Sequence, residues 1–474
     1  MNNLPLVVDL DGTLLRSDLL VETGFLWLRQ HPLRVPTLLS WLAQGKTILK
    51  RNLAESTSLE INELPFDQDV LRFIREQHAM GRRIILATAS DMRLAQKIAE
   101  HIGIFEEVLG SHDGINLASE VKATALVERF GKHGFDYMGN SDADLAVFAT
   151  ARDAYVVNAS DKVRRKARRL GNVKSELGCE SASWSDWLQA IRIHQWVKNL
   201  LIFIPLFAAH RYHEWPLLGL SLLVFLCFSL CASSVYLLND LFDLQDDRHH
   251  YLKKTRPLAS GRIAIGKVVL LCPLLLMTSF GLALWQLPAI AVIGLASYYI
   301  LTLFYSLWLK RLVMIDVITL AILYTSRLIV GAVALNIAMS FWLLAFSMFM
   351  FLSLALVKRY AELVQVRSSR RTFKARGRGY FADDLHMIAS LGSASGYMAV
   401  MVLALYVNDN KITQLYKHPE FIWLACPLLL VWISRVWMLA HRGQMNEDPV
   451  TFAIRDRLSL VIIATVLCIF WFAI

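Results

Sequence analysis

The sequence predicts two domains, a soluble α/β domain followed by an all-α bundle that crosses a membrane several times. In residues 1–185, apolar β-runs alternate with helical patterns, which is typical of a parallel sheet with helical connections. From Trp187 to Ile474, apolar blocks of about 18 to 22 residues recur, and each is long enough to cross a hydrocarbon core. The mean hydropathy of +0.44 and the 19% of charged residues exclude a disordered chain and a simple soluble enzyme.

Four short apolar runs in the first domain are predicted strands of a Rossmann-like sheet. They are residues 6–10, 83–88, 135–138 and 154–157. The stretch between the first two runs, residues 18–80, is mainly helical in pattern. Because ligands bind beyond the carboxyl ends of parallel strands, we expect the site of this domain where these runs end.

Asp9 and Asp11 stand at the end of the first predicted strand, and Gly12 after them permits a tight turn. Two carboxylates two residues apart at this place can face one cleft, although an isolated motif of this kind could also be only a turn. Other polar residues at predicted strand or helix ends favour the cleft. They are Thr88, Lys122, Asn140 and Asp144.

Together these residues resemble the four motifs of the haloacid dehalogenase-like phosphohydrolases, over roughly residues 4–160. The resemblance implies that Asp9 is the nucleophile that takes the phosphoryl group and that Asp11 is the general acid and base. Thr88 and Lys122 would hold the phosphoryl oxygens. Residues 18–80 match a helical cap, which in this family governs which phosphate ester enters.

The same resemblance implies a Mg²⁺ site, because a cation offsets the repulsion between a carboxylate and an anionic ester. The implied ligands are Asp9, Asp11, Asn140 and Asp144. Asn140 stands where the family more often has an aspartate, which leaves Asp144 as the charged ligand of that loop. An amide oxygen can still coordinate Mg²⁺.

Nine membrane helices are predicted in the second domain, residues 186–474. They lie near residues 190–209, 216–238, 266–287, 289–308, 313–335, 340–357, 387–407, 420–440 and 458–474. With the N-terminus inside, the inner loops carry twenty Lys and Arg residues and the outer loops carry three. The positive-inside rule therefore predicts a cytoplasmic first domain and a C-terminus outside. No signal peptide is expected, and the six cysteines form no disulfide or zinc pattern.

The sequence from Asn239 to Asp247 directly follows an apolar span and is rich in acids. At about 100° per residue, Asp240, Asp243 and Asp247 lie within about 60° of one another on a helix. Three carboxylates on one face repel without a cation, so the pattern indicates a Mg²⁺ site that captures a diphosphate. The alternative is a solvated acidic loop.

Further polar residues are predicted at the same side of the membrane. Arg192, Gln195 and Asn199 share a helix face beside Lys198, as a phosphate-binding face or as interfacial anchors. Asp316 and Arg327 are about 20° apart in helical phase, and an arginine so deep is a site residue or a structural partner of a carboxylate. Lys358 and Arg359 end the sixth span as phosphate ligands or as snorkelling cations.

Over residues 187–474, the chain resembles the UbiA superfamily of intramembrane prenyltransferases. The resemblance rests on Asn239–Asp247 and on the segment around Lys310–Asp316. Within that superfamily, the segments 194–199, 256–261 and 358–362 resemble the decaprenyl-phosphate phosphoribosyltransferase branch.

That branch implies transfer of 5-phosphoribose from phosphoribosyl pyrophosphate to a polyprenyl phosphate. Mg²⁺ on the three aspartates would hold the pyrophosphate. The residues expected to neutralise donor phosphates are Lys198, Lys253, Arg256 and Lys358. The product carries a phosphate monoester that the first domain would hydrolyse. The two steps together would give a lipid-linked pentose donor for envelope glycans. The expected location is a bacterial-type inner membrane.

Two other functions stay open at this stage. The second domain could be an aromatic prenyltransferase that uses a polyprenyl diphosphate, or a transport or anchor module for the phosphatase. No pattern of basic and aromatic residues indicates nucleic-acid binding. Prenyl length and the formation of a homo-oligomer are also left open.

Overall fold

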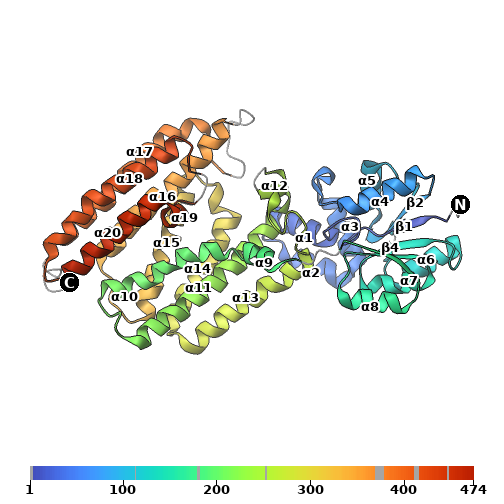
Figure 1. Ribbon diagram of the computed structural model, residues 1–474, viewed down its shortest axis with the longest axis horizontal. Helices are drawn as coiled ribbons and strands as arrows, with labels where there is room; N and C mark the ends of the chain where they lie inside the picture. Colours follow the sequence, from blue (N-terminus) through green and yellow to red (C-terminus); the bar gives the residue numbers. More distant parts are fainter. Residues whose placement is uncertain are drawn as a thin grey trace. The chain divides into compact units, whose positions relative to one another are not determined.

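The computed structural model describes residues 4–112, 114–178, 182–250, 253–368, 378–409, 416–445 and 448–474. The chain forms two compact units (Figure 1). The first comprises Met1–Ile191 and Tyr236–Pro273, and the second comprises Arg192–Val235 and Leu274–Ile474. Residues that the sequence analysis counted but that lie outside the described ranges are Cys179, Arg370, Arg371, Lys374, Arg376 and Lys411.

A six-stranded parallel sheet in the order β3-β2-β1-β4-β5-β6 forms the centre of the first unit. Its strands are β1 (Leu6–Val8), β2 (Ile84–Asp91), β3 (Glu107–Ser111), β4 (Asp136–Gly139), β5 (Ala154–Val157) and β6 (Val173–Leu177). Leu6 and Val8 pack in one apolar cluster and Val7 in another, as the two-residue period of a strand buried on both faces requires. The predicted parallel α/β fold is confirmed.

Helices cover both faces of this sheet (Figure 1). One face carries α4 (Gln68–Ala79) and α5 (Met92–Ile102), and the other carries α6 (Glu120–Phe130), α7 (Leu145–Thr150) and α8 (Asp161–Arg169). The chain builds outward from β1 to β3 on one side and from β4 to β6 on the other. The strand order therefore reverses between β1 and β4, and a crevice is expected beyond their carboxyl ends.

A helical insertion lies between β1 and β2. It consists of α1 (Leu19–Gln30), α2 (Val35–Gln44), α3 (Lys46–Ser56) and the 3₁₀ turn η1 (Ile61–Glu63). Trp27, Leu49 and Leu53 form its own small core. The predicted cap extended to residue 80, but α4 packs on the sheet through Val70 and Ile74, so the cap ends before it.

The segment Tyr236–Pro273 completes the first unit. It contains the end of α11 (Trp215–Phe242), α12 (Leu244–His249), η4 (Lys253–Thr255) and the start of α13 (Ile265–Gln286). Arg248 of α12 donates to both carboxylate oxygens of Glu22 in α1, over 2.9 and 2.7 Å, and both side chains are buried. Because a buried ion pair is costly to break, this contact fixes α12 against α1.

The elements of the second unit in the described ranges are all helices. Helix α9 (Trp184–Ala190) still belongs to the first unit. Besides most of α11 and α13, the second unit contains η3 (Ile193–Phe203), α10 (Ile204–Ala208), α14 (Ala289–Leu307), η5 (Leu309–Arg311), α15 (Ile315–Ala334), α16 (Phe341–Ser368), η6 (Ala382–Asp384), α17 (Leu385–Val407), η7 (Pro419–Leu424), α18 (Ala425–His441), α19 (Pro449–Arg455) and α20 (Arg457–Ala473). Helix α15 contributes to two apolar clusters, with Tyr324 in one and Leu323 in the other. It is therefore the central helix of this unit.

Seven helices of the described chain are long and apolar enough to cross a membrane, or up to eight if α19 and α20, which meet at 84°, form one span. The chain is a multi-pass membrane protein, but the predicted number of nine spans is not confirmed. The first predicted span, residues 190–209, contains the shorter stretch Ile193–Ala208, most of it 3₁₀ helix. Lys198 and Asn199 interrupt its apolar run and are buried on polar partners.

Candidate functional site

The carboxyl ends of β1 and β4 bring the residues of the soluble site together. Asp9 follows β1, and its backbone N–H donates to the carbonyl of Met138 in β4 over 2.9 Å. Lys122, in the first turn of α6, donates to Asp9 Oδ1 over 2.7 Å. Its ammonium lies 3.7 Å from Asp144 Oδ1. Asp9, Lys122 and Asp144 thus meet at the carboxyl ends of the two strands between which the strand order reverses.

Tyr137 joins this cluster from inside β4. Its hydroxyl accepts a hydrogen bond from Lys122 Nζ over 3.0 Å and donates one to Asp144 Oδ1 over 2.7 Å. Burial raises the pKa of Tyr137 well above its usual range, and Asp144 and Asp9 add to that rise. The phenol therefore stays protonated and holds the lysine and the aspartate in register.

Asp11 lies on the cap side of the same loop. Its Oδ1 accepts from the backbone N–H of Leu19 over 2.9 Å, and its Oδ2 accepts from Ser90 Oγ over 2.5 Å. The Thr88 hydroxyl accepts from the backbone N–H of Ser90 over 3.0 Å. The ends of β1 and β2 are thereby tied together, and Thr88 and Asp11 reach the same site.

Burial shapes the charge of both carboxyl groups. Burial raises the pKa of Asp9 to about 6 although Lys122 opposes the rise. The pKa of Asp11 rises to about 7, first through burial and then through the nearby charge of Asp18. Burial alone would lower the pKa of Lys122, but Asp9 and Asp144 raise it above its ordinary value. The lysine therefore remains a cation, while burial favours the protonated form of both carboxyl groups, and more so for Asp11 than for Asp9.

Asn140 and Asp144 have different surroundings in the loop after β4. A Cβ at Gly12 would lie 2.0 Å from Asn140 Nδ2, and Gly12 has a φ of +76°, so only glycine lets the amide approach the nucleophile loop. Asp144 Oδ2 accepts from Asn140 N, Ser141 N and Ser141 Oγ over 3.1, 2.9 and 2.7 Å. Asp144 therefore shapes the loop, and its role as a metal ligand stays a prediction.

The ligand chemistry of this edge fits Mg²⁺. Across the described ranges, no three His, Cys, Asp or Glu side chains are grouped so that they could hold a metal ion by themselves. Mg²⁺ commonly takes only one or two protein carboxylates and completes its shell with substrate phosphate and water. Asp9, Asp11 and the Asn140 amide supply such oxygens at the carboxyl ends of β1 and β4.

One cap residue also reaches this edge. Lys50 of α3 donates to the carbonyl of Ala89 over 2.5 Å and to Asn116 Oδ1 over 3.0 Å. Burial lowers its pKa below the usual range, against the attraction of Asp11 and Asp18. The cap thus places a cation beside the strand end that carries Thr88.

The acidic motif of the first unit is organised around one arginine. Arg256 Nη1 donates to Asp247 Oδ2 over 2.6 Å and to Asp240 Oδ1 over 3.2 Å. Lys253 Nζ lies 3.8 Å from Asp247 Oδ1. Burial raises the pKa of Asp247, although Arg256 and Lys253 oppose the rise. Two buried carboxylates and two cations of the predicted set therefore converge.

Asp243 departs from the predicted single helix face. Helix α11 ends at Phe242, and Asp243 has φ −101° and ψ 14° as the residue before α12. Asn239 contributes its carbonyl, which accepts from the backbone N–H of Asp243 over 2.9 Å. The Asp243 carboxylate lies 3.7 Å from Arg29 in α1. The structure therefore pairs Asp240 with Asp247 across a break in the helix and turns Asp243 to the cap.

In the second unit, Lys198 and Lys358 share one carboxylate, that of Asp448. The ammonium groups lie 2.8 and 3.2 Å from Asp448 Oδ2, and Tyr324 donates to Asp448 Oδ1 over 3.2 Å. Burial alone would raise the pKa of Asp448, but the two lysines hold it well below its usual range. This cluster joins η3, α15, α16 and the start of α19, and it places two predicted phosphate ligands side by side.

Arg327 and Asp316 both lie on helix α15, but they bind different partners. Arg327 donates to Asn199 Oδ1 over 2.8 Å and to the Tyr298 hydroxyl over 3.0 Å, so it binds an amide and a phenol. Asp316 lies 2.9 Å from Arg359, and both side chains are fully buried. The Asp316–Arg359 pair has the burial of a structural contact, and the two predicted site residues of this helix are not brought together.

Arg192 and Gln195 begin the same segment as Lys198. The backbone N–H of Gln195 donates to the carbonyl of Arg192 over 2.8 Å, and the segment from Ile193 onward is 3₁₀ rather than α-helical. Three residues per turn place Gln195 and Lys198 in line, whereas Arg192 precedes the helix with a φ of +54°. Asn199 is rotated from them and faces Arg327.

Sequence reasoning missed Tyr137, Ser90, Lys50 and Asp448. Tyr137 has the pattern of a core strand residue, and Ser90 could have been found from its place two residues after Thr88. Asp448 stands before Pro449 at the start of a short helix, where its side chain also accepts from the Val450 N–H over 3.2 Å. An aspartate there reads as an ordinary helix cap, so its lysine partners could not be found from the sequence.

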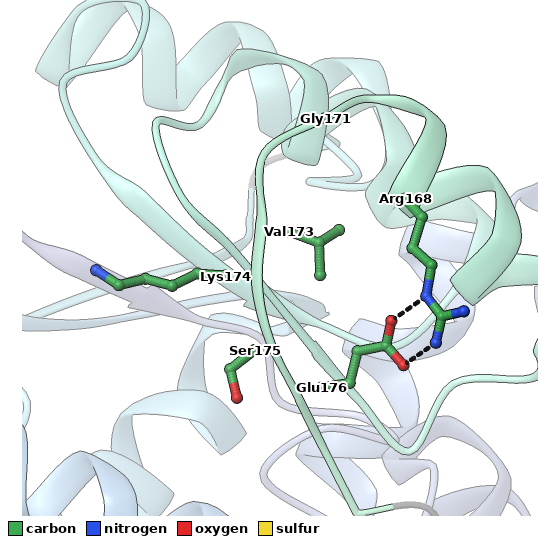
Figure 2. Close-up of a pocket in the computed structure, with 6 residues that line it drawn as sticks. All are labelled: Arg168, Gly171, Val173, Lys174, Ser175 and Glu176. Atoms are coloured by element: carbon green, nitrogen blue, oxygen red, sulfur yellow. Dashed lines mark hydrogen bonds and ion pairs between the residues drawn. The ribbon is translucent and has the colours of Figure 1, made fainter.

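A hollow of about 310 Å³ lies elsewhere on the first unit and is lined by Arg168, Gly171, Val173, Lys174, Ser175 and Glu176 (Figure 2). Arg168 and Glu176 face each other across it and pair through two hydrogen bonds of 2.6 and 2.8 Å. The hollow lies along the edge strand β6 and the end of α8, away from the central strands β1 and β4 that carry the predicted site. Arg168 is neutralised by Glu176 within the hollow and Lys174 by Asp153 outside it, and no function is assigned to the hollow.

Comparison with known proteins identifies both parts of the chain. The UbiA prenyltransferase family matches residues 200–453, and the haloacid dehalogenase-like hydrolase family matches residues 6–149. A protein of Sinorhizobium fredii named y4nM is 37% identical over 96% of this chain and 88% of its own length. A decaprenyl-phosphate phosphoribosyltransferase of Mycobacterium tuberculosis is 30% identical over 59% of this chain and 92% of its own length.

Among solved structures, a UbiA homologue from Archaeoglobus fulgidus bound to DMAPP and Mg²⁺ covers 60% of this chain and 98% of its own, with 16% identity and a TM-score of 0.46. The UbiA match spans more than half of the chain, and the y4nM match spans nearly all of it. The chain therefore belongs to the UbiA prenyltransferase family and carries a haloacid dehalogenase-like domain at its N-terminus.

Proposed function

We propose that this protein transfers 5-phosphoribose from phosphoribosyl pyrophosphate to a polyprenyl phosphate and then removes the 5-phosphate from the lipid product. The similarity to decaprenyl-phosphate phosphoribosyltransferases supports the first step, and the haloacid dehalogenase-like domain supports the second. The observation that carries the proposal is the arrangement of Asp240, Asp247 and Arg256. Acids that hold a metal and a guanidinium that holds phosphate are the two groups that a diphosphate donor needs.

In the first step, Asp240 and Asp247 are the residues that would hold Mg²⁺, with Asp243 as the predicted third ligand. When bound, Mg²⁺ supplies positive charge to the pyrophosphate. Arg256 and Lys253 are proposed to neutralise phosphate oxygens of the donor, as are Lys198 and Lys358 of the second unit. These cations stabilise the charge that develops on the leaving group.

The bond between ribose C1 and the pyrophosphate oxygen breaks as this charge develops, leaving an oxocarbenium-like ribose. An oxygen of the polyprenyl phosphate forms the new bond to C1, and pyrophosphate departs with the bonding electron pair. The lipid is dilute within a membrane and the donor is soluble, so holding the two in attacking geometry is the main contribution of the protein. Arg192, Gln195, Asn199, Arg327 and Arg359 are proposed to shape that site.

In the second step, Asp9 attacks the phosphorus of the 5-phosphate, and Asp11 gives a proton to the departing ribose oxygen. Water then attacks the aspartyl phosphate, Asp11 takes its proton, and inorganic phosphate is released. Lys122, held by Asp9 and Tyr137, and Thr88 are proposed to bind the phosphoryl oxygens. The cytoplasmic position of both sites and an inner-membrane location belong to the same proposal.

The experiment that tests the first step is a donor screen with the purified full-length protein. We expect the protein to consume phosphoribosyl pyrophosphate in the presence of a polyprenyl phosphate and Mg²⁺, with release of one pyrophosphate for each lipid modified. Asp240→Asn should abolish this release, and Asp69→Asn on the exposed surface of α4 should not. Release that persists undiminished in Asp240→Asn would contradict the proposal.

A second candidate is an aromatic prenyltransferase, which the description of the matched family as prenyltransferases favours. In that case the acids would hold a polyprenyl diphosphate, and an aromatic acid would be the acceptor. The same screen separates the two, because this activity consumes a polyprenyl diphosphate and leaves phosphoribosyl pyrophosphate intact. If the protein consumes neither donor, a transport or anchor role for the second domain would replace both.

A further inference from the structure

Helix α2 of the cap exposes an apolar face. Val35, Leu39 and Leu42 are 45%, 57% and 48% exposed, and none of the residues of α2 is buried. Leu33 before the helix and Ile48 after it are exposed as well. Single exposed apolar residues are ordinary, but a contiguous group on one element indicates a surface that binds something.

The helix has a second apolar face that accounts for its packing. Leu38 and Trp41 pack against the small core of Trp27, Leu49 and Leu53. At about 100° per residue, Val35, Leu39 and Leu42 lie within about 60° of one another, beside the packed face. The fold of the cap therefore uses Leu38 and Trp41 and leaves the neighbouring apolar face about half exposed.

The sequence around this face is rich in cations. Between Glu22 and Glu55 it contains no Asp or Glu and five cations, Arg29, Arg34, Lys46, Lys50 and Arg51. Arg29 pairs with Asp246 and Arg51 with Glu55, and Lys50 binds the carbonyl of Ala89. Arg34 and Lys46 flank α2 at its two ends, both are exposed, and neither forms an ion pair with any described residue. The surface is thus apolar at its centre and basic at its rim.

We propose that α2 lies in the headgroup region of the anionic cytoplasmic leaflet of the membrane that the chain itself crosses. An apolar helix face flanked by Lys and Arg is the combination that binds an anionic lipid surface, through burial of apolar side chains and attraction to lipid phosphates. A bilayer is always available to this surface, because the same chain contains seven helices of membrane-spanning length among its described residues.

The contact has a consequence for the soluble site, which rests on the proposed function. Helix α2 runs directly into α3, and Lys50 of α3 reaches the carbonyl of Ala89 beside Thr88. A cap held at the leaflet presents this edge to phosphate monoesters carried on lipids. The α2–α3 pair thereby favours lipid-borne substrates over soluble ones.

The test places a fluorophore on α2 in the full-length protein, one chain to a nanodisc of anionic lipid. The label is attached at Leu39→Cys after Cys179→Ser and Cys468→Ser, and the matched control label is at Met80→Cys, which is 75% exposed at the end of α4. We expect nitroxide-bearing lipids to quench the label at position 39 at least about threefold more than the label at position 80, and less so in neutral lipid. Equal quenching at both positions would overturn the proposal, because docking on protein surfaces gives no contact with lipid.

A second measurement follows the enzymatic consequence. In Val35→Ser/Leu39→Ser/Leu42→Ser, hydrolysis of a lipid-borne phosphate monoester in the disc should fall about tenfold, since burial of the three side chains at the leaflet is lost. Hydrolysis of p-nitrophenyl phosphate should stay unchanged, which shows that the cap still folds. If the wild type hydrolyses no lipid-borne monoester, the proposed second step fails, whereas the quenching result still decides whether α2 binds the leaflet.

Discussion

At the scale of single residues, Tyr137 is the most informative side chain of the soluble site. Its hydroxyl lies between Lys122 and Asp144, and it is fully buried. The phenol therefore holds Lys122 and Asp144 at fixed positions, and in this position Lys122 donates to Asp9. Few other side chains could replace Tyr137 here, because the group between Lys122 and Asp144 must stay neutral, donate one hydrogen bond and accept another.

Tyr137→Phe should lower kcat for p-nitrophenyl phosphate about tenfold, because one buried hydrogen-bonding group is worth roughly 1.4 kcal/mol and Lys122 is left less well held. Steady-state hydrolysis by the full-length protein measures this. Tyr155→Phe in β5 is the matched control, since Tyr155 is also buried but lies outside the network. Equal activity of the two variants would show that Tyr137 does not position Lys122.

Asp448 has the corresponding role in the second unit. It holds Lys198 and Lys358 together, so two cations from different elements face the same place. Without the carboxylate, the lysines would repel each other or lose a proton, because unpaired charges are costly to bury. Asp448 is therefore a positioning residue for the phosphate ligands.

Asp448→Asn should lower the kcat/KM of the transferase about tenfold or more and leave phosphatase activity unchanged. Asp456→Asn is the matched control. Asp456 also caps a helix and pairs with an arginine, Arg435, over 2.6 Å, but it touches neither lysine. A loss of the same size in both variants would indicate a structural effect and contradict the positioning role.

At the scale of elements, Asp67 ties three segments of the first unit together. Its carboxylate accepts from Arg16 Nε and Asn158 Nδ2, each over 2.8 Å, and it caps α4 by accepting from the backbone N–H of Val70 over 3.2 Å. Burial alone would raise the pKa of Asp67, but Asn158 and Arg16 hold it below the ordinary value of 3.8. The folded state therefore favours the ionised carboxylate.

The sign of the pH dependence follows from this lowered pKa. The stability that Asp67 contributes is present above pH 3.8 and is lost as the pH falls through its lower folded value. At pH 7, Asp67→Asn should reduce the protection of α4 amides from hydrogen exchange by about 2 kcal/mol, and the difference from wild type should shrink toward pH 3. Asp69→Asn, which removes only an exposed pair with Arg72, should change little. A deficit that stays constant with pH would contradict the account.

Elements also show where sequence patterns stop being informative. Four of the six strands, β1, β2, β4 and β5, were predictable because apolar runs end in polar residues there, and Asp9 and Thr88 were found for that reason. The edge strands β3 and β6 were not predicted, since most of their residues are only partly buried and form no apolar run. The single helix face of Asp240, Asp243 and Asp247 was not correct, because α11 ends at Phe242. A helical wheel assumes a continuous helix, and the residues around Asp243 include no Gly or Pro that would predict the end of α11.

The difference between the first predicted span and the structure has a related cause. Residues 190–209 are apolar enough for a membrane helix, but the chain forms η3 and the short α10 there. Lys198 and Asn199 find partners in Asp448 and Ser229, which are 250 and 30 residues away in the sequence. Contacts at such separation decide the local structure, and a window of neighbouring residues does not contain them.

At the scale of the whole molecule, the chain joins a UbiA family domain and a haloacid dehalogenase-like domain. Both families and the approximate extent of each match were predictable, because each domain carries several motifs in the right order. The division into compact units was not, since the segment from Tyr236 to Pro273, which includes the acidic motif, groups with the first domain. Several contacts with the first domain support this grouping, among them the buried Glu22–Arg248 pair and the ion pairs Arg29–Asp246 and Arg262–Asp186.

The proposed reactions also belong to the scale of the whole chain. The first produces a lipid with a phosphate monoester, and the second removes such an ester, so one polypeptide would supply its own phosphatase substrate. Neither site alone indicates this order. It follows from the chemistry of the product together with the presence of both domains in one chain.

The most direct test of this order is mass analysis of the lipid product of Asp9→Asn, incubated as full-length protein with labelled phosphoribosyl pyrophosphate and polyprenyl phosphate. We expect the variant to accumulate polyprenylphosphoryl 5-phosphoribose, while the wild type forms the dephosphorylated lipid and inorganic phosphate. A variant that yields the same dephosphorylated lipid as the wild type, or a wild type that leaves the 5-phosphate in place, would contradict the account.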